Sequence, residues 1–147
     1  MPSERSNPAG CNCLALRQAA RRVTRVYDRY LAASGLRATQ YSILARLKRR
    51  GSMTINALAD ELLMDRTTLG RNILPLQRDG LVAAVRGKSD RRSKELRLTA
   101  AGTARVRSAV KNWNEAQAEF ERAFGTGRAE ALRALLDGIS SAEMDAA

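Results

Sequence analysis

Residues 54–80 read TINALADELLMDRTTLGRNILPLQRDG, and this stretch decides the fold. Thr54 and Asp65 each precede a run of apolar residues at helical spacing, and side chains of these types cap helix N-termini. Gly80 follows the second run, as glycine commonly follows the end of a helix. The predicted buried positions are Ile55, Leu58, Ala59 and Leu62 in the first helix and Leu69, Ile73 and Leu76 in the second. The stretch therefore predicts two helices joined by a very short turn, a helix-turn-helix.

Pro75 interrupts the second of these helices. Its nitrogen carries no proton to donate to the carbonyl of Arg71, so the helix loses one backbone hydrogen bond there. We expect the helix to continue to about Arg78 with a bend at Pro75.

A hairpin is predicted after the helix-turn-helix. Residues 81–85 have the apolar character of a strand, residues 87–92 form a polar turn, and Leu96 and Leu98 alternate in a returning strand. The result is a two-stranded wing with a basic tip.

Four further helices are predicted around this centre, over residues 12–33, 39–50, 100–124 and 128–140, each with one apolar stripe. Gly35 and Gly51 close the first two, and Gly125 and Gly127 break the third from the fourth. The predicted fold class is mainly α with a small β wing.

The charge of the chain points to a polyanionic partner. The sequence has 26 Lys and Arg against 15 Asp and Glu, a net charge of +11, which favours nucleic acid or, less commonly, an anionic membrane surface. The basic residues are scattered over several elements, which does not suit a membrane-binding helix. Residues 100–147 hold six basic and seven acidic residues, so we do not expect the polyanion to bind there.

The sequence lacks the residues of a catalytic or metal site. It contains no histidine, which excludes a histidine base and histidine metal ligands, and it has no glycine-rich phosphate loop. We expect no enzyme activity, no metal and no cofactor. Neither a secretory signal nor a membrane-spanning stretch is found, so a cytoplasmic protein is expected.

Several short motifs, taken in their order and spacing, resemble the MarR family of bacterial regulators over residues 11–139. The matching segments are Gly35-Leu36, Gln40-Tyr41 and Leu44 before the helix-turn-helix; Leu58-Ala59 and Asp65-Arg66-Thr67-Thr68 within it; Leu76 and Asp79-Gly80-Leu81-Val82 at its exit; and Asp90-Arg91-Arg92, Leu98-Thr99 and Gly102 in and after the wing. The wing tip is the most specific of these.

The resemblance implies a homodimer with intertwined first, fifth and sixth helices that binds palindromic DNA and releases it when a small molecule or oxidant acts between its lobes. Residues 1–11 are then a flexible N-terminus, residues 12–35 and 100–147 a helical dimerisation region, and residues 36–99 the winged helix-turn-helix DNA-binding region. The apolar stripes of the last two helices, with Trp113 and Phe120, are interpreted as dimer core rather than as a cofactor site.

The N-terminal turns of the second helix in the helix-turn-helix hold the candidate base-reading residues. A recognition helix reads DNA mainly through these turns, and the side chains that face away from the apolar stripe are Arg66, Thr67, Thr68 and Arg71. Gly70 on the same face would let the backbone approach a phosphate. The alternative is a solvated helix face.

The candidate DNA contacts in the wing are Lys88, Asp90, Arg91 and Arg92. By resemblance to the family, Arg92 enters the minor groove and Asp90 fixes its orientation. The alternative is a flexible basic hairpin that contributes only salt-dependent attraction.

A basic stripe runs along the first predicted helix, where Arg17, Arg21, Arg25 and Arg29 repeat every four residues and repel one another. Acidic residues of a partner subunit, DNA phosphates or an effector carboxylate, held above all by Arg17 and Arg21, could neutralise it. A solvated face is the fourth alternative.

Cys13 is a candidate redox sensor. It aligns with the reactive cysteine of the organic hydroperoxide sensors within the family, and Tyr27 falls where those sensors have a tyrosine bonded to the thiolate of the other subunit. Arg17 and Ala38 stand where they have further tyrosines. A helix N-terminus with Arg17 one turn away favours the thiolate, whereas an inert cysteine is the alternative.

The leading functional hypothesis is a repressor that binds an inverted-repeat operator as a homodimer and responds to a small molecule or an oxidant. The competing hypothesis is a winged-helix interaction module that binds protein, or nucleic acid without sequence specificity.

Overall fold

The computed structural model describes residues 10–87, 90 and 92–144, and the chain is mainly helical with one small antiparallel sheet. The elements are α1 (Asn12–Leu31), the short 3₁₀ helix η3 (Ala32–Ser34), α2 (Ala38–Arg50), β1 (Met53–Thr54), α3 (Ile55–Leu62), α4 (Arg66–Arg78), β2 (Val82–Arg86), β3 (Lys94–Leu98), α5 (Ala100–Phe124) and α6 (Thr126–Ser140). The predicted fold class is confirmed. The predicted flexible segment lies almost wholly outside the described residues.

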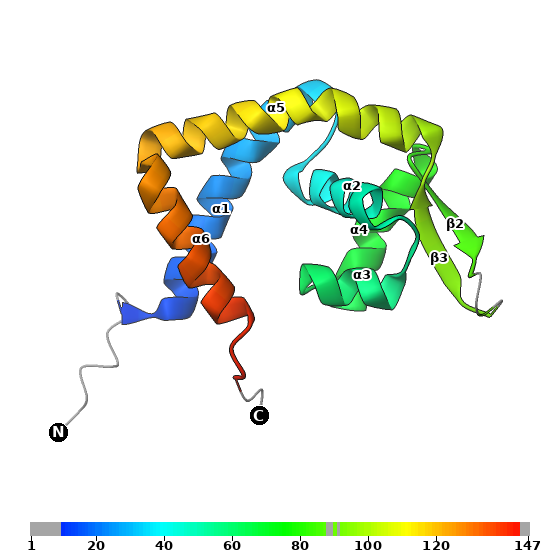
Figure 1. Cartoon of the computed structure of the whole chain (residues 1–147), viewed down its shortest axis with the longest axis horizontal. Helices are drawn as coiled ribbons and strands as arrows, with labels where there is room; N and C mark the ends of the chain where they lie inside the picture. Colours follow the sequence, from blue (N-terminus) through cyan, green and yellow to red (C-terminus); the bar gives the residue numbers. More distant parts are fainter. Residues whose placement is uncertain (1–9, 88–89, 91, 145–147) are drawn as a thin grey trace.

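The long helix α5 connects the two ends of the molecule (Figure 1). Helix α6 follows one end of α5, and α1 lies on the same side of the molecule and meets α5 near its middle. Helices α2, α3 and α4 and the sheet are gathered at the other side. Helices α1 and α6 therefore lie away from the helix-turn-helix, and α5 links the two parts.

The helix-turn-helix forms as predicted. The Thr54 hydroxyl accepts the backbone N–H of Ala57 at 3.1 Å and so caps α3, and Asp65 caps α4. The turn between them begins at Leu63, which has left-handed backbone angles of φ 50° and ψ 42°. Its conformation closes α3 and allows α4 to begin three residues later.

Helix α4 continues through Pro75 to Arg78, as predicted, and Gly80 with a φ of 73° follows its end. The bend at Pro75 stays a prediction. Two helix ends differ from the prediction. Gly127 lies within α6 and does not break it, because a single glycine costs a helix only about 1 kcal/mol relative to alanine. The last residues assigned to the first helix form η3 instead.

The sheet has three strands in the order β1-β3-β2. The predicted two-stranded hairpin of the wing is confirmed, and the third strand, β1, was not predicted. The hairpin of β2 and β3 is present, with Val82 opposite Leu98 and Arg86 opposite Lys94. The added strand β1 pairs Met53 with Leu96 and Thr54 with Glu95. Its two residues are too few to show an alternating pattern, and the pairing with β3 is what makes them a strand.

The core lies at the end of the molecule that contains the helix-turn-helix. Five of the seven predicted core positions are buried, and the other two, Ile55 and Leu62, are half-buried at its edge. The largest fully buried side chains are Leu31, Ile43, Leu44, Leu47, Leu58, Leu69 and Leu76. Helix α4 packs against α2, α3 and β2, which fixes the direction of its apolar face.

The start of α5 is packed closely against the segment that leads into the wing. The Thr99 hydroxyl donates to the carbonyl of Gly80 at 2.6 Å and accepts the N–H of Gly102 at 3.0 Å. A Cβ at Gly102 would overlap the carbonyl oxygen of Leu81, a backbone atom. Only glycine allows this approach.

Replacement of Gly102 by alanine should therefore lower the free energy of unfolding by about 2 kcal/mol, which is a typical cost of overpacking a core. Urea unfolding measures the change. Gly138→Ala is the matched control, because a Cβ at Gly138 in α6 meets no described atom within 4 Å. Equal stability of the two variants would contradict the proposed overlap.

Candidate nucleic-acid interface

The N-terminus of α4 is held by a two-bond cap. One carboxylate oxygen of Asp65 accepts the backbone N–H of Thr68 at 2.8 Å, and the Thr68 hydroxyl donates to the other oxygen at 2.7 Å. These bonds from Thr68 lower the pKa of the Asp65 carboxyl. The first turn is thereby ordered, and the hydroxyl proton of Thr68 is already used within the chain.

The four predicted base-reading residues of α4 share an exposed face. Arg66, Thr67, Thr68 and Arg71 are all exposed, whereas the opposite face is buried in the core. The prediction did not include Asn72, whose side-chain amide donates to the carbonyl of Thr68 at 2.9 Å. It also missed Leu74, which is 65% exposed on a helix whose other leucines are buried.

The base of the wing tip is organised by Asp90. Its carboxylate accepts the backbone N–H of Arg92 at 2.9 Å, its carbonyl accepts the N–H of Ser93 at 3.1 Å, and the carbonyl of Ser93 accepts the N–H of Gly87 at 3.0 Å. Asp90 thus fixes the backbone from which the exposed Arg92 side chain projects. Lys88 and Arg91, the other predicted contacts, lie outside the described residues.

The basic stripe of α1 is on the surface. Arg17, Arg21, Arg25 and Arg29 are exposed, and none forms an ion pair with another residue in the described part of the chain. Arg29 lies over the ring of Tyr30, 5.6 Å from its centre. The stripe is available to a partner outside this chain, and its role as an effector site stays a prediction.

Cys13 and Tyr27 are not brought together within one chain. They are 14 positions apart on the single helix α1, a rise of about 21 Å. Cys13 is exposed in the first turn, next to Cys11, whose sulfur caps the helix by accepting the N–H of Leu14 at 3.4 Å. The Tyr27 hydroxyl donates to the side-chain carbonyl of Gln117 on α5, and burial, followed by the charge of Glu121, raises its pKa. Any contact between the thiol and this tyrosine requires a second subunit, so the redox role stays a prediction.

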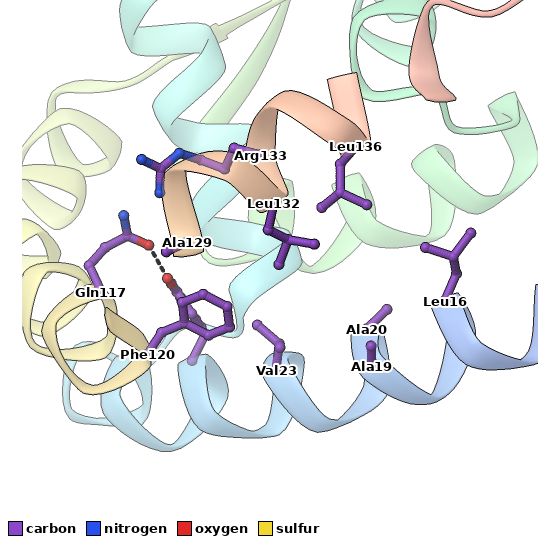
Figure 2. A pocket seen from close by; sticks show the side chains of 11 residues that line it. Leu16, Ala19, Ala20, Val23, Gln117, Phe120, Ala129, Leu132, Arg133 and Leu136 are labelled. Carbon is purple, nitrogen blue, oxygen red and sulfur yellow. Dashed lines mark hydrogen bonds between the residues drawn. The ribbon is translucent and has the colours of Figure 1, made fainter. Parts of the chain in front are cut away.

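A cavity of about 420 Å³ opens between α1, α5 and α6 (Figure 2). Its wall is apolar apart from one end, where Gln117 and Arg133 lie. The apolar lining residues are Leu16, Ala19, Ala20, Val23, Phe120, Ala129, Leu132 and Leu136, with Tyr27 beside Gln117. This surface belongs to the predicted dimerisation region.

The joint between the two ends of the molecule was not predicted from the sequence. The carboxylate of Asp28 on α1 accepts the N–H of Ala38 at 2.7 Å and so holds the start of α2. Arg105 on α5 donates to the carbonyl of Ser34 at 3.2 Å, and the ring of Tyr41 on α2 stacks on Trp113 of α5. These contacts join partners up to 72 positions apart, and they link α1 and α5 to α2, which packs against α4.

Within the described ranges, no group of three or more His, Cys, Asp or Glu side chains could hold a metal ion. The helices of the same ranges include none with the length and apolar character needed to cross a membrane.

A regulator of the winged helix-turn-helix class is defined by this arrangement, in which α4 exposes a basic face beside a wing with an ordered arginine. The comparisons with known proteins agree. Residues 36–94 match the model of the MarR family, and the chain is 27% identical over 120 residues to the transcriptional regulator PecS of Dickeya dadantii, covering 80% of this chain and 72% of PecS.

Solved structures of transcriptional regulators are similar to this protein over nearly the whole chain. The transcriptional regulator MosR of M. tuberculosis, in complex with DNA, is 38% identical, with a TM-score of 0.79 and coverage of 88% of this chain and 93% of MosR. The transcriptional repressor CouR, bound to a 23-mer DNA duplex, is 25% identical, with a TM-score of 0.81 and coverage of 95% and 99%. The chain belongs to the MarR family of transcriptional regulators, which are not enzymes.

The cap of α4 gives a prediction about pH. Because the folded-state pKa of Asp65 is lowered, its stabilising effect is present at neutral pH and is lost as the pH falls through that lowered pKa. Asp65→Ala should therefore lower the urea midpoint at neutral pH and differ less from the unchanged protein in strong acid. Asp65→Asn, which can still cap, is the control. A midpoint difference for Asp65→Ala that is independent of pH would contradict this account.

Proposed function

We propose that this chain is a repressor that binds inverted-repeat operator DNA as a homodimer. The observation that carries the proposal is the exposed face of α4, where Arg66, Thr67 and Arg71 lie opposite a fully buried apolar face. A helix held in this way can enter a major groove with its N-terminal turns facing the bases. The DNA complexes of MosR and CouR support the same use of the fold here.

The wing supplies a second contact in this proposal. Asp90 orders the backbone at Arg92, so the guanidinium starts from a fixed point beside the groove occupied by α4. An arginine in an adjacent minor groove responds to groove width and to phosphate charge. The net charge of +11 adds a salt-dependent attraction to any duplex.

Dimerisation would occur through α1, α5 and α6. Leu31 is the only fully buried residue in the described α1, and Ala129 the only one in α6, although both helices have an apolar stripe. Leu16, Leu136 and Ile139 are 40%, 37% and 42% exposed. A second copy would cover this surface and would place two α4 helices on successive major grooves.

An effector would act by changing the spacing between the two α4 helices. The helices α1 and α5, which contribute to the proposed dimer, are bonded through Asp28 and Arg105 to the start of α2 and to the η3 turn just before it. Helix α2 in turn packs against α4. A small molecule or an oxidation at Cys13 that moved these helices would therefore move α4 as well. We propose only the chemical class of the signal, which is a small molecule or an oxidant.

DNA affinity tests the two contact assignments. Arg71→Ala should weaken binding to the operator about tenfold or more, the usual cost of losing an arginine contact to guanine. Arg92→Ala should weaken binding and reduce the dependence on salt concentration by about one counterion. Fluorescence anisotropy over a series of salt concentrations measures both quantities.

Lys111→Ala removes the same charge from an exposed position on α5, outside the proposed contact region, and serves as the control. An Arg71→Ala variant with unchanged affinity would refute the role of α4, and an unchanged salt slope for Arg92→Ala would refute that of the wing. Uniform binding to every duplex would instead favour a module that binds nucleic acid without sequence specificity.

Sedimentation velocity tests the dimer. Leu136→Glu places a charge in the apolar lining of the cavity between α1 and α6, and it should give a monomer that no longer binds the inverted repeat tightly. Leu63→Glu, at a leucine that is 70% exposed in the turn before α4, should remain a dimer. A Leu136→Glu variant that is still dimeric would exclude this face as the interface.

A further inference from the structure

We propose that Gly70 is a specificity-determining position of α4, where bare helix backbone next to Leu74 packs against thymine methyl groups on the floor of the major groove. The inference rests on the proposed function, because it takes α4 to be the helix that enters the groove. The proposed contact is apolar van der Waals packing, in addition to the polar contacts proposed for Arg66, Thr67 and Arg71.

Nothing within the described chain accounts for a glycine at this position. Gly70 is the fifth residue of α4, well inside the helix, where glycine is less favourable than alanine. Its φ is not positive, so the backbone does not require glycine. A Cβ built at Gly70 meets no atom within 4 Å, so packing does not require glycine either.

Gly80 and Gly102 differ from Gly70, because the fold requires a glycine at each of these two positions. Gly80 has a φ of 73°, and a Cβ at Gly102 would overlap a backbone carbonyl. In both places the fold itself explains the glycine. At Gly70 the surroundings within the chain are open, and an explanation must come from something that approaches the exposed face from outside.

The neighbours of Gly70 define what could approach. Residues three and four positions away share one face of a helix, so Arg66 and Thr67 lie on one side of Gly70 and Leu74 on the other. Leu74 is 65% exposed, which leaves an apolar side chain unpartnered in the middle of a basic face. Gly70 itself is half-buried at the edge of this face, three residues before the buried Ile73. The edge of the face is therefore a strip with no side chain at Gly70 and an aliphatic one at Leu74.

The chemistry of this strip favours a base edge over a phosphate. The N–H of Gly70 lies beyond the first four of the helix and is used in the bond to the carbonyl of Arg66, so it cannot be donated to a phosphate. Only van der Waals contact is available there. The apolar group that the major groove offers is the C5-methyl of thymine.

The experiment starts with duplexes that the unchanged protein selects from a random library. Each thymine of the selected half-site is then replaced by deoxyuridine, which lacks only the methyl group. We expect one or two thymines per half-site at which this replacement weakens binding by about fivefold, the low end of the energy of a base contact.

Gly70→Ala should bind the selected duplex about tenfold more weakly than the unchanged protein, with affinity for an unrelated duplex changed by less than about twofold. The sensitivity to deoxyuridine should be lost in this variant, because the added methyl group holds the helix away from the thymine. Its melting temperature should rise, since alanine favours the helix, so that the lost affinity does not come from unfolding. Gly10→Ala, at an exposed glycine outside the proposed dimer helices where a Cβ also meets no atom within 4 Å, should keep the affinity for both duplexes.

Two results would overturn the inference while the proposed function stands. One is a Gly70→Ala variant that binds the selected duplex as tightly as the unchanged protein. The other is an equal loss of affinity on both duplexes, which would place a phosphate at Gly70. If the unchanged protein selects no sequence, the proposed function fails and the inference fails with it.

Discussion

The burial of one face of α4 is the constraint on which the rest of the structure depends. Leu69 and Leu76 are fully buried and Ile73 is 3% exposed, all against a core built from α2, α3 and β2. Rolling the helix would expose these three side chains at a cost of about 1.5–3 kcal/mol each, which is comparable with the whole stability of a typical domain. The opposite face, with Arg66 and Arg71, therefore has a fixed direction, and the cap at Asp65 fixes where it begins.

In the proposed dimer, the other end of the molecule determines the distance between the exposed α4 faces of the two subunits. Helices α1 and α6 have apolar stripes that one chain leaves largely uncovered, and the cavity between them and α5 has an apolar wall. The bonds of Asp28 and Arg105 join α1 and α5 to the start of α2 and to η3, and α2 packs against α3 and α4 of the helix-turn-helix. In the proposed dimer, a change at α1 or α5 becomes a change in the distance between the two α4 helices, which is the quantity that an inverted repeat constrains.

The sequence was most informative where structure is local. The caps at Thr54 and Asp65 and the apolar spacing in α4 depend on residues three or four positions apart, and all were predicted. The two residues of β1 become a strand only by pairing with β3, more than 40 positions away, and they were missed. The contact of Tyr27 with Gln117 joins residues 90 positions apart and was also missed. Leu74 was missed for a different reason, since spacing shows which residues can be buried but not why an apolar residue is left exposed.

The central claim is that the exposed faces of two α4 helices lie in major grooves one helical turn apart. Methylation interference at guanine N7, which lies in the major groove, tests it most directly on a duplex selected by the protein. The account predicts two symmetric patches of interference on the same side of the duplex, with their centres about 10 base pairs apart. A single patch, or binding that methylation in the major groove does not disturb, would contradict it.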